Sequence, residues 1–177
     1  IGGRYHEIYV QSLSYQEFLL FHELEDNDDA LSKYINYGGL PGLKQVGLDD
    51  EEFVWDYIRA VFHTVMLKDI VERNNIRNVS FLNTLLRYFA DTIGKLSSLN
   101  NISKFMKSQG LDVSVKSIAA YLNYFRDAYL LLTVDRFDIH GKKLLESNEK
   151  IYFGDVGLRN LIAGGERQGD IEKILEN

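Results

Sequence analysis

The chain of 177 residues is long enough to bury the core of one large or two small domains, and its 45% hydrophobic and 26% charged residues are typical of a globular protein. The absence of cysteine excludes disulfides and thiolate metal sites, and the formal net charge is −6 at pH 7. Because no apolar run approaches the roughly 20 residues of a membrane-spanning helix and no signal peptide pattern opens the chain, we expect a cytoplasmic protein without membrane contact.

The charge is unevenly distributed along the chain. Residues 1–94 carry eight Lys or Arg against 15 Asp or Glu, residues 95–145 carry eight against four, and residues 146–177 carry four against seven. Only the middle segment is therefore basic, which is where a phosphate backbone would find counter-charge. A surplus of this size is modest, and many proteins that bind no nucleic acid carry as much.

The first expected elements are a strand and a helix. Residues 4–10 alternate in the manner of a strand. Ser14 and Glu17 have the spacing of a capping box, which predicts that a helix begins directly after Ser14. We expect this helix to run on through Leu24 into an acidic loop.

A glycine-rich turn follows. Residues 34–43 read YINYGGLPGL, and because glycine allows positive φ while proline fixes its own φ, they predict a constrained turn between two helices. Residues 52–75 then show one long helical pattern. A further helix is expected over residues 81–93, and Gly94 ends it.

Residues 100–129 have the pattern of a helix-turn-helix. A first short helix ends at Gly110, which supplies a left-handed residue, and Ser114 is placed to cap the second helix. Small and polar residues, among them Ala120 and Tyr124, leave the outward face of the second helix free to lie against a partner. Apolar residues at three- and four-residue spacing define the inward faces, Ile102, Phe105 and Met106 in the first helix and Ile118, Leu122, Phe125 and Tyr129 in the second.

Two β-prone segments follow the helix-turn-helix. Residues 130–135 and 150–153 are expected to pair as the wing of a winged helix, with the helix over 81–93 as the first helix of that unit. Beyond the wing, residues 149–160 read EKIYFGDVGLRN and predict a strand, a glycine turn and a short helix.

The order of these motifs resembles a known family. The sequence contains, in order, GRYHEIYVQSLSYQEF, the YGGLPG turn, LKDIVERNNIRN, the helix-turn-helix, and RFDIHGKKLLESNEKIYFGDVGLRN followed by LEN. This set is similar to the predicted prokaryotic AAA-type ATPases, which are related to the STAND group of P-loop NTPases. In that family a nucleotide-binding module precedes a winged helix and a C-terminal domain of unknown function that resembles PD-(D/E)XK nucleases.

The resemblance implies a mainly α fold, in which a helical lid bundle is followed by a winged helix-turn-helix with a small antiparallel β wing. Residues 1–12 would be the last strand of a truncated ATPase core, and residues 13–78 the helical lid. Residues 79–153 would be the winged-helix domain, and residues 154–177 the start of a truncated nuclease-like domain. The chain is thus expected to be the middle of a longer protein, cut at both ends.

The resemblance also implies roles for three places. Arg4 matches the arginine after the family's sensor strand and is the expected catalytic group, within reach of a nucleotide γ-phosphate. Gly38, Gly39 and Pro41 match the GGxP turn of the lid, which is expected to lie near the adenine of the cofactor. Glu176 is similar to the first acidic residue of the nuclease-like domain, where carboxylates would hold a metal ion. The structural alternatives are a salt-bridged strand residue, an ordinary loop and a surface acid.

A nucleotide-binding motif is missing from this sequence. It contains no G-x-x-x-x-G-K-[ST], so the backbone cradle and the lysine that hold ATP phosphates are absent. We expect ATP and Mg²⁺ to serve the parent protein, and this chain alone to bind neither cofactor and to be inactive as an enzyme.

Two functions of different class follow. In the first, the lid and winged helix belong to an ATPase, bind double-stranded DNA through the second helix, and couple nucleotide state to the C-terminal domain. The residues expected to contact DNA are Lys104, Lys107, Lys116, Ser117, Asn123, Lys142 and Lys143.

In the second function, the winged helix is a protein-interaction or homo-oligomerisation module that makes no nucleic-acid contact. Tyr121 and Tyr124 lie near the outward face of the second helix, and few arginines are available there for base edges, so this alternative stays open.

Overall fold

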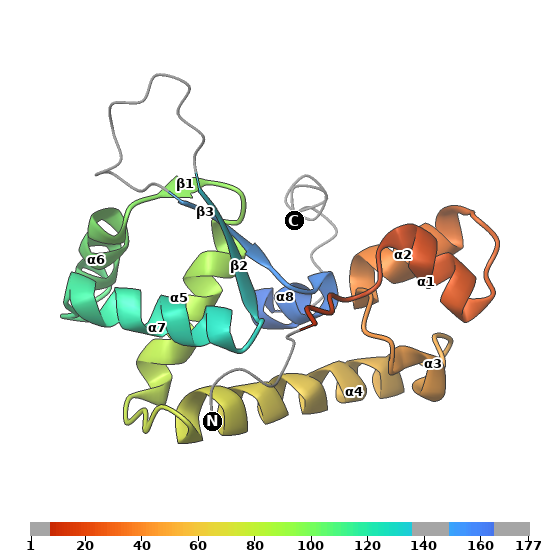
Figure 1. The fold of residues 1–177 in the computed structure, drawn as a ribbon, viewed down its shortest axis with the longest axis horizontal. Helices are drawn as coiled ribbons and strands as arrows, with labels where there is room; N and C mark the ends of the chain where they lie inside the picture. Colours follow the sequence, from red (N-terminus) through yellow and green to blue (C-terminus); the bar gives the residue numbers. More distant parts are fainter. Residues whose placement is uncertain (1–7, 136–148, 165–177) are drawn as a thin grey trace.

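A computed structural model describes residues 8–135 and 149–164 of the chain. Figure 1 shows two groups of elements at opposite ends, with α8 between them and α4 running lengthwise below both. One end consists of α1 (Tyr15–His22), α2 (Asp28–Tyr37) and α3 (Leu43–Val46). It is joined to the other end by α4 (Glu51–Thr64) and the π-helix η1 (Val65–Glu72). The second end consists of α5 (Val79–Asp91), β1 (Leu96–Ser97), α6 (Leu99–Ser108), α7 (Val115–Asp127), β2 (Leu131–Asp135) and β3 (Glu149–Phe153). The helix between the two ends is α8 (Val156–Ala163).

The start of α1 is the predicted capping box. The Ser14 side chain accepts from the backbone N–H of Glu17, and the Glu17 carboxylate accepts from the Ser14 backbone N–H at 2.9 Å. The helix ends earlier than the sequence suggests, because Glu23 adopts a left-handed conformation with φ 58°. In the glycine-rich turn, Gly38 ends α2 with φ 78°, so the predicted turn between two helices is confirmed.

The long helical pattern over residues 52–75 is two kinds of helix. Asp50 caps α4 by accepting from the backbone N–H of Phe53, and after Thr64 the winding changes to the i→i+5 bonding of a π-helix. Within η1, Met66 and Ile70 are buried. Apolar residues four apart suit both kinds of helix, so the sequence pattern does not distinguish them.

The second end has the winged-helix arrangement. Along the chain its elements follow the order α5, β1, α6, α7, β2, β3. The three strands form an antiparallel sheet with β3 in the middle, and in the register of β2 and β3, Leu131 pairs with Phe153 and Asp135 with Glu149. The predicted wing strands are confirmed, and the fold is mainly helical with a small antiparallel sheet. Strand β1 was not predicted, because two residues carry no periodicity of their own and the strand depends on pairing with β3.

The inward faces of α6 and α7 are largely as predicted, with two exceptions. Ile102, Met106, Ile118, Leu122 and Phe125 are all buried. Phe105, in contrast, is 41% exposed and packs against the ring of Tyr88, with ring centroids 4.7 Å apart. Tyr129 is 50% exposed because α7 ends before it and its left-handed backbone, with φ 55°, turns its side chain off the helical stripe.

The expected strand over residues 4–10 lies mostly outside the described residues. Ile8, Tyr9 and Val10 are described, and they are exposed and form no regular secondary structure. The helix predicted after the glycine turn at residues 154–157 is confirmed as α8. Within the described ranges, no helix has the length and apolarity that crossing a bilayer requires.

Candidate functional site

The predicted site residues fall into three groups. Arg4, Lys142, Lys143 and Glu176 lie outside the described residues, and their roles stay predictions. The predicted DNA-contacting residues that are described lie on α6 and α7, two helices that pack against each other. The residues of the glycine-rich turn form a separate group, which lies against α8.

On α7, the predicted residues line up along one outward stripe. Lys116 and Asn123 are exposed and are separated by two helical turns, with the small Ala120 between them. Ser117 is half-buried and lies beside the stripe. Its hydroxyl is 2.9 Å from that of Ser114, and its N–H donates to Ser114 as part of the helix cap.

Arg126 extends this stripe, although it is not among the residues predicted from the sequence. It is exposed, and it follows Asn123 by one turn on the same helix. The two residues line a narrow cleft of about 100 Å³ between α7 and the sheet, where Glu149 lies opposite. The signal that would have found Arg126 is its helical spacing from Asn123.

Two lysines of α6 add positive charge to the same end. Lys104 and Lys107 are both exposed, and Lys107 Nζ lies 3.4 Å from the carboxylate of Asp112. An exposed pair of this kind contributes at most about 1 kcal/mol and is screened by salt. It therefore leaves Lys107 available to an anionic partner.

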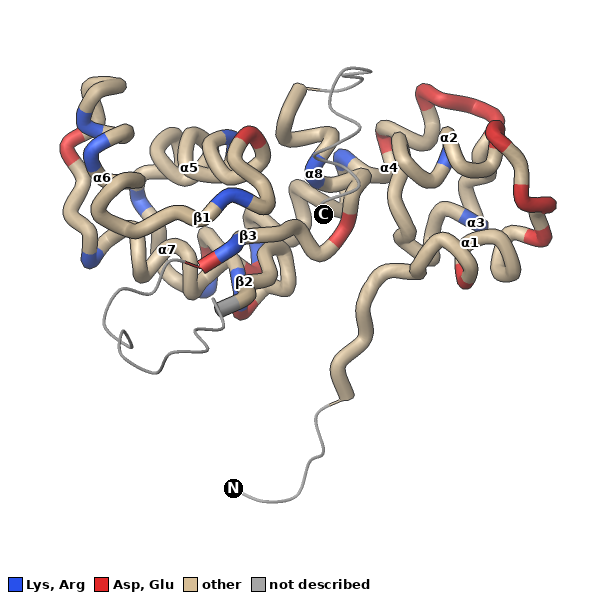
Figure 2. Tube along the Cα trace, turned by 90° about the horizontal axis from the view of Figure 1, so that it is seen from above, with Lys and Arg blue, Asp and Glu red and all other residues tan. Residues whose placement is uncertain are grey.

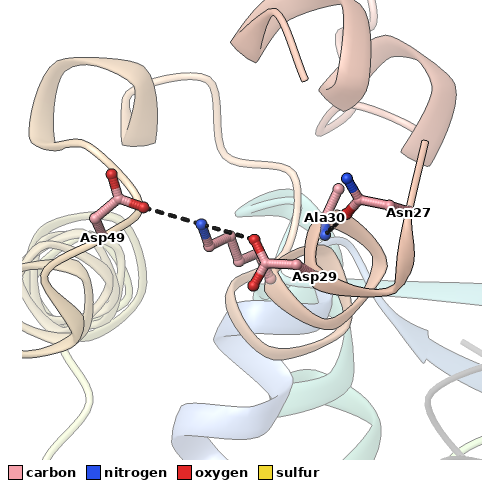
Figure 3. A network of polar contacts seen from close by, with 5 residues as sticks. Asn27, Asp29, Ala30 and Asp49 are labelled. Atoms are coloured by element: carbon pink, nitrogen blue, oxygen red, sulfur yellow. Dashed lines mark hydrogen bonds and ion pairs between the residues drawn. The ribbon is translucent and has the colours of Figure 1, made fainter. Parts of the chain in front are cut away.

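The two ends of the molecule differ in charge. Figure 2 shows Asp and Glu gathered along the loop between α1 and α2, whereas Lys and Arg are distributed over α6, α7 and the sheet. Lys33 lies at this acidic end and forms ion pairs with two aspartates. Its Nζ is 3.1 Å from Asp29 and 2.9 Å from Asp49 (Figure 3). Among the described residues, acidic side chains therefore predominate at the α1–α2 end, whereas the α6–α7 end carries both signs with a small excess of Lys and Arg.

The glycine-rich turn is bonded to the start of α8. The Asp155 carboxylate caps α8 by accepting from the backbone N–H of Leu158 at 3.1 Å, and it also accepts from the backbone N–H of Gly39 at 2.8 Å. Asp155 is buried, and this burial raises the pKa of its carboxyl above the usual range, although the N–H groups of Gly39, Leu158 and Gly157 act in the opposite direction. The turn and α8 therefore share one buried carboxylate.

The segment before α1 is held in the same place. The Ser12 hydroxyl donates to the carbonyl of Gly154 at 2.8 Å, and the Leu13 N–H donates to the carbonyl of Gly39 at 2.8 Å. The carbonyl of Leu13 accepts from the Tyr34 hydroxyl at 3.0 Å. Three segments that are far apart in sequence thus meet at one point.

Two glycines permit this close approach. A Cβ on Gly39 would overlap the backbone of Leu13, and a Cβ on Gly157 would overlap the carbonyl oxygen of Tyr37. Both glycines are buried, as is Gly38, whereas Pro41 is exposed. The backbone N–H and C=O of Gly39 are already bonded within the chain, and the proposed role of this turn near adenine stays a prediction.

Helix α8 also carries two buried polar side chains that bind other helices. Asn160 donates to the carbonyls of Ile35 and Asn36 in the last turn of α2, at 2.9 and 3.0 Å. Arg159 is 1% exposed, and its Nε and Nη2 donate to the carbonyl of Ala90 in the last turn of α5, at 3.3 and 3.1 Å. Both side chains satisfy carbonyls that a helix end leaves without intrahelical partners.

A groove of about 1000 Å³ lies beside this junction. Segment 9–15, α2 and the ends of β2 and β3 line it, and the lining includes the rings of Tyr9, Tyr15 and Tyr34. Among the described residues that line it there is no Lys, Arg or His, while Glu17 and Asp155 are acidic. Nothing in this lining would neutralise a phosphate group.

The family model described as "Domain of unknown function (DUF8612)" matches residues 28–168. The chain belongs to this family. The DUF8612 match begins at α2 and includes the glycine-rich turn, the winged helix and α8. These are the parts that the junction around Asp155 holds together.

Two longer proteins are similar to this DUF8612 chain over its whole length. An uncharacterized protein of Haemophilus influenzae is 30% identical over 181 residues, which are 100% of the chain and 44% of that protein. The uncharacterized protein MJ1544 of Methanocaldococcus jannaschii is 27% identical over 189 residues, which are 100% of the chain and 41% of that protein. The chain thus spans less than half the length of these relatives and corresponds to a region of longer proteins.

Proposed function

We propose that this chain is the lid and winged-helix region of a cytoplasmic AAA-type, STAND-related ATPase, and that its winged helix binds double-stranded DNA. The observation that supports DNA binding best is the outward stripe of α7. In a helix-turn-helix the second helix enters the major groove. Lys116 and Asn123 are exposed on this helix, and Lys104 and Lys107 are exposed on α6, which packs against it. Lysines supply phosphate contacts, and an asparagine side chain can pair with the edge of adenine.

The charge distribution is consistent with this proposal. The acidic α1–α2 end would be repelled from a phosphate backbone, which favours approach of DNA from the α6–α7 end (Figure 2). In the longer protein, Arg4 would act on the nucleotide, Mg²⁺ and ATP would be held mainly by parts outside this chain, and Glu176 would belong to a nuclease-like metal site. The lid would pass nucleotide state on to the C-terminal domain.

One observation favours the second candidate function, a protein-interaction or homo-oligomerisation module. Phe105 is partly exposed on the outer side of α6 and forms a ring pair with Tyr88. Exposed aromatic side chains are enriched at protein interfaces. This surface lies on the same helix as Lys104 and Lys107, so the two functions would compete for it.

The salt dependence of duplex binding tests the proposal. Fluorescence anisotropy of a labelled random duplex would be followed from about 50 to 200 mM salt. Five lysine–phosphate contacts, from Lys104, Lys107, Lys116, Lys142 and Lys143, predict a log–log slope of about −4.5, at roughly −0.9 per contact. An absence of binding at the lowest salt would contradict DNA binding, and concentration-dependent self-association in the same buffer would support the interaction module.

A further inference from the structure

Helix α8 is positioned to connect the two ends of the molecule. It contacts α2 and α4 on one side and α5 on the other, and in Figure 1 it lies between the two groups of helices. Its polar contacts divide in the same way. Asp155 and Asn160 bind the turn and the last carbonyls of α2, whereas Arg159 binds the last turn of α5, the first helix of the winged helix.

The segment that enters α1 is bonded to both partners of this connection. Ser12 binds the residue directly before Asp155, and Leu13 binds Gly39, whose N–H is held by Asp155. A shift of this segment would therefore act on the turn and on the N-terminus of α8 together. Because a side chain at Gly39 would overlap the backbone of Leu13, and one at Gly157 the carbonyl of Tyr37, a shift of the segment toward the turn could not be absorbed in free space there.

We propose that Ser12 and Leu13 form a strap whose position sets that of α8 and, through Arg159, that of α5. The coupling runs through hydrogen bonds between rigid elements, which is the kind of path that can carry a displacement across a domain. It gives the winged helix a mechanical connection to whatever moves the chain before residue 12. This inference goes beyond the proposed function, because it holds whether the winged helix binds DNA or protein.

Native-state amide hydrogen exchange of the chain tests the strap. The variant Gly39→Ala places a Cβ against the backbone of Leu13 and should push the strap away from the turn. We expect exchange of the α8 amides and of the amides at the end of α5 to become at least about tenfold faster, because local opening of a cooperative unit is read directly by exchange. The amides of α6 serve as the reference for global unfolding.

The matched control is Gly47→Ala. Gly47 has φ 84° and its Cβ would meet no atom within 4 Å, so this variant adds backbone strain in the same half of the molecule without displacing the strap. It should leave the difference in exchange between α8 and α6 unchanged. Equal effects of the two variants on α8, or acceleration in Gly39→Ala that stays within segments 8–24 and 34–47, would overturn the proposal.

A milder variant covers the case in which Gly39→Ala does not fold. Ser12→Ala removes the hydroxyl that bonds to the Gly154 carbonyl and to the Asp155 carboxylate, and it creates no overlap. Loss of this hydroxyl should accelerate exchange in the first turn of α8 and at the end of α5 by about fivefold. Unchanged exchange at both places in a folded Ser12→Ala protein would equally overturn the strap.

Discussion

The Asp155 carboxylate accepts a hydrogen bond from the backbone N–H of Gly39 across 116 residues of sequence. The same carboxylate caps α8, so one side chain both begins a helix and holds it against the glycine-rich turn. A buried acceptor in this position is surrounded by donors. Any replacement must therefore accept from the same N–H groups or leave them unpaired.

Asp155→Asn should lower the free energy of unfolding by about 1–3 kcal/mol. The asparagine side chain keeps one acceptor oxygen but places an NH₂ group where a carboxylate oxygen accepts from a backbone N–H, so donor faces donor. Urea denaturation followed by circular dichroism measures the change. The control is Asp49→Asn, which alters an exposed carboxylate paired with Lys33 and should change stability little. Equal stability of the two variants would show that the buried contacts contribute nothing.

Arg159→Lys should destabilise the protein by about 1–3 kcal/mol, although it keeps the positive charge. The guanidinium places two N–H groups on the carbonyl of Ala90 and a third on Asn160, and an ammonium group cannot reproduce that planar arrangement. Denaturant unfolding provides the measurement. Arg87→Lys, an exposed position on α5, is the matched control, and a similar effect at both positions would contradict this account.

Much of the fold can be predicted from local sequence signals. Helix starts at Ser14 and Ser114 depend on contacts within three residues, and the inward face of α7 depends on spacing within one helix. The end of α7 was misplaced because Tyr129 adopts a left-handed backbone, closed by hydrogen bonds to the carbonyls of Arg126 and Phe125, which its side-chain type does not indicate. The π-helix was missed because its apolar spacing also fits an α-helix.

The junction around α8 could not be predicted in the same way. The sequence EKIYFGDVGLRN indicates a strand, a turn and a helix, but Asp155, Arg159 and Asn160 are polar residues that a sequence pattern assigns to the surface. Their burial depends on backbone groups of residues 35, 36, 39 and 90, which are distant in sequence. The predicted domain boundary at residue 154 stays a prediction, yet α8, which follows it, packs against α2, α4 and α5, which all precede it.

His22 should make stability depend on pH. Burial, and then the positive charge of Lys44, lower the pKa of His22 in the folded protein, and its Nε2 has no hydrogen-bond partner among the described residues. The unfolded chain, with a pKa of about 6.5, therefore binds a proton before the folded chain does. Stability is fully present above about pH 6.5 and is lost as the pH falls through the lowered pKa.

Melting curves between pH 8 and pH 5 measure this loss. His22→Phe removes the titrating group and suits the neighbouring ring of Phe18, so the melting temperature should depend less on pH than in the wild type. His22→Gln, which is polar and does not titrate, should flatten the same range. An unchanged pH dependence in both variants would exclude His22 as its source.

Reversing exposed lysines of α6 and α7 should weaken binding of duplex DNA. Lys104→Glu combined with Lys116→Glu reverses two charges on the exposed faces of α6 and α7, and both positions lack a packing role that would affect stability. Loss of two of five phosphate contacts should change the log–log salt slope from about −4.5 to about −2.7 and weaken duplex binding at every salt concentration. The melting temperature should stay within a few degrees of the wild type.

A charge-matched control separates the groove from overall charge. Lys68→Glu combined with Arg73→Glu makes the same change in net charge at η1 and the residue after it, outside the winged helix. If long-range attraction alone held the DNA, both double variants would lose the same amount of duplex affinity. If α7 docks in the groove, the variant with Lys104→Glu and Lys116→Glu should lose more affinity than the control. Because both proteins carry the same net charge, anisotropy titrations at identical salt compare them directly, and equal slopes would remove the groove-docking interpretation.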